Sequence, residues 1–420
     1  MDHLLIVDDD EDIRDLYAVV ASGLGYHVSE AGGVDECLER YARQAPTVIL
    51  LDLSMPDGDG VEMLRKFAQL HCDAAVILIS GEDTRILNTA KRLGDRLGLL
   101  MRSSLQKPVA IDALETALER TLRGSTPLAR RQQDMEEPVA EWIEKEQLES
   151  AISSDELVLH YQPKVDFEST LGPEIVSCEG LVRWKHPERG ILLPGAFVPK
   201  AESWGLVGAL TEAVLAQAIQ QQIQWSSMGI SCQISFNLSP SQLTDLSLPD
   251  RLADQVISAG VDPSLLTAEV TEQAAMADIA KATDVLTRLR LKGFGVSLDD
   301  FGTGYSSLAE LYRLPLSEIK FGRVLIVDTD VDRDARVVVR ALAALAKTLG
   351  IPVCAEGVET KSQARFVRDV GCSVGQGFVF AKALPAVEFM KLYSEQGLLL
   401  RDSASDAWDL WLQYGGIDAL

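Results

Sequence analysis

The sequence predicts an α/β protein with two folded parts, a doubly wound parallel sheet followed by a (β/α) barrel of the TIM type. Three observations support this fold class. The chain has 420 residues, more than one ordinary core accommodates. Its first part alternates short aliphatic runs with amphipathic segments. Its second part repeats strand-like runs that end in polar or charged residues, and the gaps from Asn237 to Glu269 and from Glu269 to Asp299 are 32 and 30 residues, about one βα unit each.

Aliphatic runs at residues 4–7, 48–51 and 76–79 predict the central strands of the first sheet, because strands buried on both faces read as unbroken apolar runs. The segment 124–127, Gly-Ser-Thr-Pro, interrupts this pattern and predicts a domain boundary. We therefore expect a doubly wound, flavodoxin-like domain over 1–123, a linker over 124–153, a barrel over 154–397 and a tail helix over 398–420.

The linker and the tail both contain apolar residues at helical spacing. Residues 137–152 are charged, with Trp142 among the apolar positions, and predict an amphipathic connecting helix. This helix is either a spacer or an element that transmits a signal or dimerises. In the tail, Trp408, Trp411 and Leu412 predict an apolar stripe that docks on the barrel or on a partner.

The composition narrows the class of partner and the compartment. The chain carries 39 Lys and Arg against 63 Asp and Glu, a formal charge of −24, which argues against a nucleic acid polymer as partner. Metals or a few local cations could still hold a small anion. Six widely spaced cysteines without a CxxC pair are typical of reduced core thiols in a cytoplasmic protein. The first residues carry no basic signal-peptide region, and no apolar stretch reaches the roughly 18 residues of a membrane span, so we expect no membrane partner.

In the first domain, oxygen-bearing side chains lie where the predicted strands end. Asp8 and Asp9 follow the first strand, Asp52 the second, Ser80 ends the third, and Lys107 follows a possible fourth. These strand ends converge on one crevice of a doubly wound sheet. Three carboxylates there could bind one Mg²⁺. The ion would screen Asp52 as it attacks a phosphoryl donor, and Lys107 and Ser80 could bind the phosphoryl oxygens.

These residues resemble the receiver domain of bacterial response regulators. The matching segments are Val7-Asp8-Asp9-Asp10, Asp52, Met55-Pro56-Asp57-Gly58, Ser80 and Lys107-Pro108. The resemblance implies that Asp52 accepts phosphate from a cognate histidine kinase, that Asp8 and Asp9 hold Mg²⁺ with it, and that Ser80 reports the phosphorylated state. The family often has an aromatic switch residue where this chain has Ser104, so a phosphate-insensitive domain is the alternative.

In the second domain a longer series of polar residues follows predicted strands. Its members are Glu179, Asn237, Glu269, Asp299, Lys320 and Glu356. One such residue is usually a helix cap, whereas six in series predict an active site. The carboxylates and the amide oxygen suit Mg²⁺ or Mn²⁺ rather than Zn²⁺. Asp299 could bridge two ions, with Asp300 completing the second site, and paired ions of this kind make water a nucleophile. Lys320 could orient that water or neutralise developing charge, and Glu356 could ligate metal or hold the water.

The second domain resembles the EAL domain of cyclic di-GMP phosphodiesterases. The matching segments are Tyr161-Gln162-Pro163, Glu179 to Trp184, Asn237-Leu238-Ser239, Glu269 to Glu272, Asp299 to Leu308, Lys320, Glu356 to Glu359 and Gln376-Gly377. The resemblance implies a barrel modified from the eightfold type that hydrolyses cyclic di-GMP to linear pGpG with Mg²⁺ or Mn²⁺. It implies a first metal bound by four residues and a second bound by two. The first set is Glu179, Asn237, Glu269 and Asp299, and the second is Asp299 and Asp300.

The resemblance also assigns residues around the metals. Arg183 is expected to pair with a ligand phosphate, as a guanidinium does well. Gln162 and Gln376 are expected to face the ligand or its water. Glu272 is expected to anchor the loop 300–308, which in the family supports dimerisation, so a homo-oligomer is expected.

Two departures from the family leave two functions open. Gly180 stands in the middle of the name-giving motif, where the family residue is not a ligand. Gly322 stands two residues after Lys320, where the family usually has an acid. The leading hypothesis is a response regulator that degrades cyclic di-GMP under control of Asp52 phosphorylation. The alternative is a weak or inactive enzyme that acts as a cyclic di-GMP receptor. Retention of the metal ligands favours the enzyme, because a receptor has no need of them.

Overall fold

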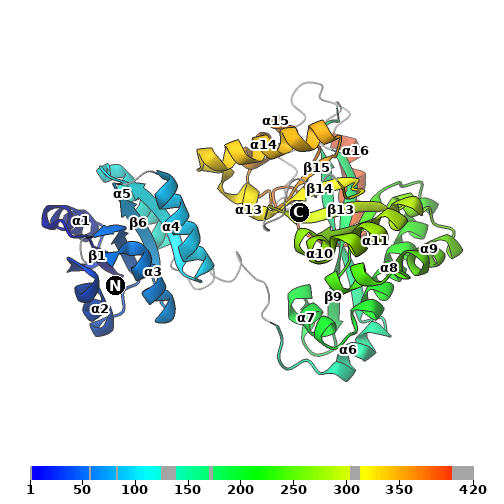
Figure 1. The fold of residues 1–420 in the computed structure, drawn as a ribbon, viewed down its shortest axis with the longest axis horizontal. Helices are drawn as coiled ribbons and strands as arrows, with labels where there is room; N and C mark the ends of the chain where they lie inside the picture. Colours follow the sequence, from blue (N-terminus) through cyan, green and yellow to red (C-terminus); the bar gives the residue numbers. More distant parts are fainter. Residues whose placement is uncertain are drawn as a thin grey trace. The chain divides into compact units, whose positions relative to one another are not determined.

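The computed structural model describes residues 2–55, 58–81, 84–123, 139–169, 174–302 and 313–399. The chain divides into two compact units, Met1–Met135 and Glu136–Leu420, shown in Figure 1. Residues 400–420 of the predicted tail helix, with both tail tryptophans, lie outside the described residues. No helix in the described ranges has both the length and the apolar character needed to cross a bilayer.

The first unit contains a five-stranded parallel sheet with helices on both faces (Figure 1). Its strand order is β2-β1-β3-β6-β7, the order of doubly wound flavodoxin-like sheets. The strands are β1 (His3–Val7), β2 (His27–Ala31), β3 (Val48–Asp52), β6 (Ala75–Ser80) and β7 (Leu100–Gln106), and a short hairpin pairs β4 (Ser54–Met55) with β5 (Gly58–Asp59). The helices are α1 (Glu11–Gly23), α2 (Val34–Arg43), α3 (Gly60–Gln69), α4 (Thr84–Arg96) and α5 (Ile111–Arg123).

Two apolar clusters hold these layers together. Side chains of α1 and α5, including Tyr17 and Leu118, pack on one face of the sheet. Side chains of α2, α3 and α4, including Phe67, pack on the other. Asp10 ends the turn after β1 by capping α1, since its carboxylate accepts from the backbone N–H groups of Asp12 and Ile13. The cap fixes where the strand stops and therefore where Asp8 and Asp9 emerge.

The second unit is a closed barrel of eight strands with one reversed strand. The ring order is β9-β11-β12-β13-β14-β15-β16-β8, and β8 also pairs with β9. Neighbours are parallel except that β8 runs antiparallel to both β9 and β16. The ring strands are β8 (Leu157–Asp166), β9 (Glu174–His186), β11 (Gln233–Asn237), β12 (Leu266–Thr271), β13 (Gly295–Phe301), β14 (Glu318–Phe321), β15 (Val353–Ala355) and β16 (Val374–Gly375). The predicted modified TIM barrel is confirmed.

Helices surround this barrel (Figure 1). They are α6 (Lys145–Ile152), α7 (Pro194–Ser203), α8 (Val207–Ser227), α9 (Leu248–Ser258), α10 (Glu272–Ala277), α11 (Ile279–Leu291), α13 (Arg323–Ile326), α14 (Arg333–Leu349), α15 (Lys361–Asp369) and α16 (Ala386–Leu399). Two short strands lie at the sheet's margins, β10 (Gly190–Leu192) against β9 and β17 (Leu384–Pro385) against β8. One continuous apolar core joins strands and helices and includes Trp184, Trp225 and Phe389.

Strand register brings the predicted site residues into one ring. Asn237 pairs with Glu269 between β11 and β12, and Asp299 pairs with Thr271 between β13 and β12. Glu179 on β9 pairs with Ser235 on the next strand, two positions before Asn237. Because side chains alternate along a strand, such neighbours face the same barrel interior.

The connecting helix is shorter than predicted. Among the described residues 139–152, only Lys145–Ile152 is helical, and residues 139–144 form a turn and extended chain. The ammonium of Lys200 takes the carbonyl oxygens of Glu141 and Ile143, each at 2.8 Å, and so removes acceptors that a helix would need. The Trp142 ring instead packs under the guanidinium of Arg189 at 4.0 Å. This end of the linker is therefore attached to the second unit.

Candidate functional site

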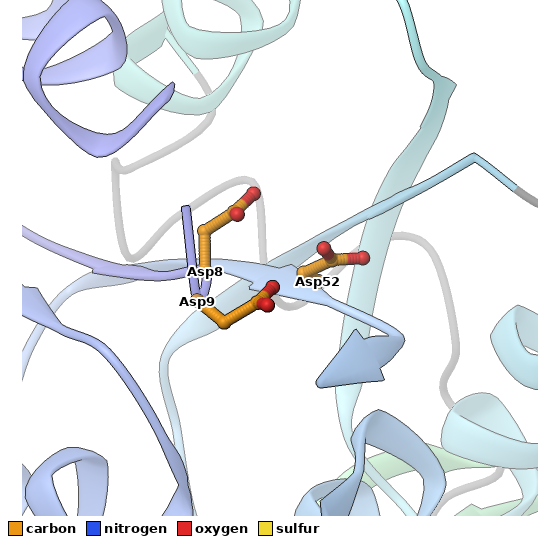
Figure 2. Close-up of side chains that lie close together, drawn as sticks. All are labelled: Asp8, Asp9 and Asp52. Carbon is orange, nitrogen blue, oxygen red and sulfur yellow. The ribbon is translucent and has the colours of Figure 1, made fainter. Parts of the chain in front are cut away.

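The first acidic cluster lies at the carboxyl ends of β1 and β3. Asp8 and Asp9 follow β1 and Asp52 ends β3, and one carboxylate oxygen of each lies within 4.8 Å of the others. Figure 2 shows the three side chains gathered at these neighbouring strand ends. Asp8 and Asp52 are buried and Asp9 is exposed. Three carboxylates with one open side fit a hard divalent ion, which takes oxygen ligands and retains water.

A lysine from the end of β7 joins two of these carboxylates. The Nζ of Lys107 lies 2.7 Å from Asp8 Oδ2 and 2.6 Å from Asp52 Oδ2. Burial raises the pKa of Asp8, although the bond from Lys107 opposes this. Burial lowers the pKa of Lys107, but Asp52 and Asp8 together raise it above its ordinary value. The backbone N–H of Lys107 donates to the carbonyl of Ser80 at 2.8 Å, which holds the predicted phosphoryl-binding residues on adjacent strands.

The barrel site is organised around Lys320. This side chain has no exposed surface, and its Nζ contacts four carboxylates from four other strands or strand ends. The contacts are Glu356 Oε1 at 2.6 Å, Glu269 Oε2 at 2.7 Å, Glu179 Oε2 at 3.3 Å and Asp299 Oδ1 at 3.3 Å. One ammonium cannot neutralise four acids, so the site retains negative charge that a divalent cation would offset.

Amide side chains complete the lining around Glu179. The Nδ2 of Asn237 donates to Glu179 Oε1 at 2.9 Å, and the Nε2 of Gln376 donates to Glu179 Oε2 at 2.8 Å. Gln376 Nε2 also donates to Gln162 Oε1 at 3.1 Å, and Gln162 Nε2 donates to the carbonyl of Ala381. The Oε1 of Gln376 is buried and accepts no hydrogen bond within the described residues. An unsatisfied buried acceptor at a strand end calls for a ligand or water that donates to it.

The carboxyl groups of this ring differ in the direction of their pKa shifts. Burial raises the pKa of Glu179, and the neighbouring charge of Glu269 adds to this effect. Burial raises the pKa of Glu356 well above its usual range even though Lys320 opposes it. Burial also acts on Glu269, but Lys164 and Lys320 outweigh it and lower the pKa of Glu269 to about 2. The two lysines therefore favour the ionised form of Glu269.

A second acidic cluster lies beside this ring. One carboxylate oxygen each of Asp299, Asp300 and Glu356 can come within 4.8 Å of the others. Asp300 has a left-handed backbone with φ of 55°, and its N–H donates to Asp299 Oδ1 at 2.8 Å. A Cβ added at Gly322 would lie 3.2 Å from Asp300 Oδ1, so position 322 borders this cluster directly. The oxygen donors fit a divalent ion, with Glu356 as a third donor beside the predicted pair.

The remaining predicted residues lie near the rim. Glu272 is buried at the start of α10, and its Oε2 accepts from the N–H of Gly302 at 2.9 Å. Residues 303–308 of the predicted loop lie outside the described residues. Arg183 lies four residues after Glu179 on β9, and its Nη1 donates to the carbonyl of Val182 at 3.0 Å. The anchoring role of Glu272 and the phosphate contact of Arg183 remain predictions.

Sequence reasoning missed two charged residues behind this site, the buried Lys164 and the partly buried Glu318. Lys164 lies on β8 and Glu318 begins β14, and their side chains meet at 3.0 Å. Lys164 also contacts Glu269 at 2.7 Å. Lys164 directly follows the quoted segment Tyr161-Gln162-Pro163, and this adjacency was the available signal. Nothing local connects it to Glu318, which is distant in sequence.

Comparisons with known proteins match both units. Residues 145–383 match the family described as EAL domain, and residues 4–119 match the response regulator receiver domain. The chain is 31% identical over 345 residues to the cyclic di-GMP phosphodiesterase RocR of Pseudomonas aeruginosa, covering 82% of this chain and 86% of RocR. It is 41% identical over 244 residues to the bifunctional diguanylate cyclase/cyclic di-GMP phosphodiesterase MucR of the same species, covering 58% of this chain.

The structural comparison agrees with these matches. The PaMucR phosphodiesterase, solved as a c-di-GMP complex, has a TM-score of 0.55 and 40% identity, covering 58% of this chain and 98% of that one. The chain spans about a third of the length of the first curated relatives that it matches, 35% in the case of MucR. These matches cover 58–60% of this chain, whereas the similarity to RocR extends over most of both chains.

Proposed function

Since this chain belongs to the EAL domain family and also contains a response regulator receiver domain, we propose that it hydrolyses cyclic di-GMP under control of the receiver. The product is linear pGpG. The observation that carries the proposal is the ring of carboxylates around the buried ammonium of Lys320 at the strand ends of the barrel. A ligand-binding barrel without chemistry would not need this concentration of buried acids, because each is costly to bury.

The proposed reaction breaks one of the two phosphodiester bonds. Water attacks phosphorus, the bond from phosphorus to the 3′ oxygen breaks, and that oxygen leaves with a proton. Two Mg²⁺ or Mn²⁺ ions would supply Lewis acidity and make water more acidic. Glu179, Asn237, Glu269 and Asp299 would hold the first ion. Asp299, Asp300 and Glu356 would hold the second.

The protein's own groups have distinct tasks in this scheme. Lys320 keeps the acids in position and neutralises charge that develops on phosphate oxygens. Glu356, whose Oε1 lies 2.6 Å from the Nζ of Lys320, is placed to hold the second ion or the attacking water. Gln376 offers its free Oε1 to the water or the ligand, with Gln162 fixing the amide. Arg183 pairs with a phosphate.

The receiver supplies control in this proposal. Asp52 accepts a phosphoryl group from a histidine kinase, with one Mg²⁺ held by Asp8, Asp9 and Asp52. The phosphoryl oxygens then take Lys107 and Ser80 as partners. We also propose that the protein acts as a homo-oligomer and works in the cytoplasm without a nucleic acid polymer or a membrane as partner. Six buried free thiols are consistent with a reducing compartment.

An assay of the purified chain tests the proposal. Wild-type protein with Mn²⁺ should convert cyclic di-GMP to pGpG, detected by liquid chromatography, and a chelator should stop the reaction. Glu179→Ala should lower the rate by about 10³-fold or more, because it removes a ligand and a contact of Lys320. Glu212→Ala, at an exposed acid on α8, is the control and should retain the wild-type rate.

One observation favours a second candidate function. Position 322 borders the Asp299–Asp300–Glu356 cluster and offers no side chain. A weak second metal site would leave a receptor that binds cyclic di-GMP and acts through protein contacts. Tight binding of cyclic di-GMP without metal, combined with no turnover at saturating Mn²⁺, would favour the receptor over the enzyme.

A further inference from the structure

A second buried lysine lies below the ring of carboxylates in the barrel. Lys164 is 1% exposed and lies on β8, the reversed strand that closes the barrel. Its Nζ contacts Glu269 Oε1 at 2.7 Å, Glu318 Oε1 at 3.0 Å and Ser235 Oγ at 3.1 Å. All three protons of the ammonium therefore have an acceptor.

The two lysines divide the carboxylate of Glu269 between them. Lys164 occupies Oε1, and Lys320 occupies Oε2 at 2.7 Å. Glu269 is fully buried, so these contacts fix the plane of its carboxylate. Only Oε2 shares its partner with Glu179, Asp299 and Glu356. Glu269 is therefore oriented with Oε2 facing Lys320 and the other acids and with Oε1 facing Lys164.

Glu318 fixes the other side of Lys164. Its Oε1 accepts from Ser297 Oγ at 2.7 Å as well as from Lys164. A continuous chain of contacts therefore runs from Ser297 on β13 through Glu318 and Lys164 to Glu269 on β12. Apolar side chains of the same volume would fill this space without the cost of removing charges from water, so stability alone gives no reason for the chain.

We propose that Lys164 is a positioning residue that holds Glu269 as a one-oxygen ligand for a divalent ion. This inference rests on the proposed function and deepens it. Lys164 touches neither substrate nor ion. It acts through Glu269, as residues behind metal ligands do when they orient those ligands, and their loss typically weakens metal binding about 10- to 100-fold.

The test measures Mn²⁺ binding without substrate. Lys164→Met leaves Glu269 and Glu318 without their shared ammonium and can fail to fold, so Lys164→Met/Glu318→Gln, which removes one charge of each sign, is the deciding variant. Calorimetry in an Asp52→Asn background reduces binding by the receiver site. We expect the double variant to bind Mn²⁺ about 10- to 100-fold more weakly. Excess Mn²⁺ should restore its kcat, with KM for cyclic di-GMP unchanged.

Glu318→Gln alone is the matched control. It keeps Lys164 against Glu269 and should change the Mn²⁺ Kd by less than about threefold. A purely structural role for Lys164 would lower the fraction of binding-competent protein but leave its Kd unchanged, and that result would overturn the inference. Equal weakening in the control and the double variant would also overturn it, because Glu318 and not Lys164 would then be responsible. Absence of Mn²⁺ binding by the barrel in wild-type protein would instead overturn the proposed function itself.

Discussion

The receiver and the barrel both use a lysine to hold together carboxylates from different strand ends, but at different depths. Lys107 is 19% exposed in its side chain and joins two acids, whereas Lys320 is fully buried and joins four. In the barrel, Lys164 also contacts Glu269, one of the acids that Lys320 joins. Under the proposed regulation, the partly exposed Lys107 would exchange partners when a phosphoryl group arrives. The deep Lys320 is a fixed part of the site, so its loss should affect folding as well as chemistry.

Replacing Lys320 with methionine should therefore have the largest effect. It leaves buried acids without their shared partner, and breaking such pairs costs about 3–5 kcal/mol. We expect the free energy of unfolding of the second unit to fall by this amount and hydrolysis to be lost. Denaturation followed by tryptophan fluorescence reports on this unit alone, because the six tryptophans lie between Trp142 and Trp411.

Lys107→Met is the matched change in the receiver. Because Lys107 is partly exposed, we expect a loss of about 1 kcal/mol, visible in far-UV circular dichroism and not in tryptophan fluorescence. If Lys107→Met and Lys320→Met lost equal amounts of free energy of unfolding, the comparison between a shallow and a deep lysine would not hold.

Mn²⁺ should restore part of the stability of Lys320→Met, since a divalent ion can neutralise the same acids.

Asp52→Asn should remove phosphorylation altogether. An amide is not a nucleophile, and it loses the charge that pairs with Lys107 at 2.6 Å. Acetyl phosphate should label the wild-type chain and not the variant on a gel that separates phosphorylated protein. The phosphoryl donor should change the rate of hydrolysis only in the wild type. A response of equal size in both proteins would rule out control through Asp52.

Gly322→Asp should strengthen metal binding by the second acidic cluster of the barrel. The new side chain starts 3.2 Å from Asp300 Oδ1 and adds an oxygen donor to the second acidic cluster. Repulsion between the acids offsets part of the gain, so we expect about 1 kcal/mol, or a 3- to 10-fold lower Mn²⁺ concentration for half-maximal hydrolysis. Gly322→Ala adds the Cβ without charge. An equal gain with alanine would contradict the explanation by a new ligand.

Tyr26→Phe should change the stability of the receiver without affecting phosphorylation or hydrolysis at neutral pH. The buried hydroxyl of Tyr26 donates to the carbonyl of Leu118 at 2.9 Å, so its loss should cost the receiver about 1 kcal/mol near pH 7. Burial raises the pKa of Tyr26 to about 12. The hydroxyl therefore contributes fully below about pH 10, the unfolded pKa, and its contribution is lost as pH rises towards about 12.

Denaturation of both proteins at several pH values, followed by circular dichroism, measures the difference in their free energies of unfolding. The gap in stability between wild type and Tyr26→Phe should shrink above about pH 10. A gap that stays constant up to about pH 12 would show that the phenol does not titrate as its burial requires.

The strand-end acids of both sites could be predicted because parallel strands place their carboxyl ends at one edge. Asp8, Asp52, Glu269 and Asp299 all follow or end aliphatic runs that read directly from the sequence. The same rule fails for β8. Since β8 is reversed, its residues nearest the site, such as Gln162, precede its deeper ones instead of following them.

Long-range partners account for the rest of what the sequence could not predict. Lys164 and Glu318 meet only when the barrel closes, because Lys164 lies within β8 and Glu318 begins β14, and neither follows the carboxyl end of an aliphatic run. The turn over residues 139–144 depends on Lys200, whose ammonium competes for carbonyl oxygens that helical periodicity assigns to a helix. Periodicity reports on neighbours within a few residues and is silent about a competitor elsewhere in the chain.

The reversed strand also has a consequence for how the barrel is assembled. β8 is the first strand of the ring in the chain, and it pairs with β16, the last. Contacts between opposite ends of a domain slow folding, because a long loop must close before they form. During synthesis, the edge of β8 that pairs with β16 therefore stays unpaired until almost the entire domain has left the ribosome. Chains interrupted before β16 should expose that edge and aggregate.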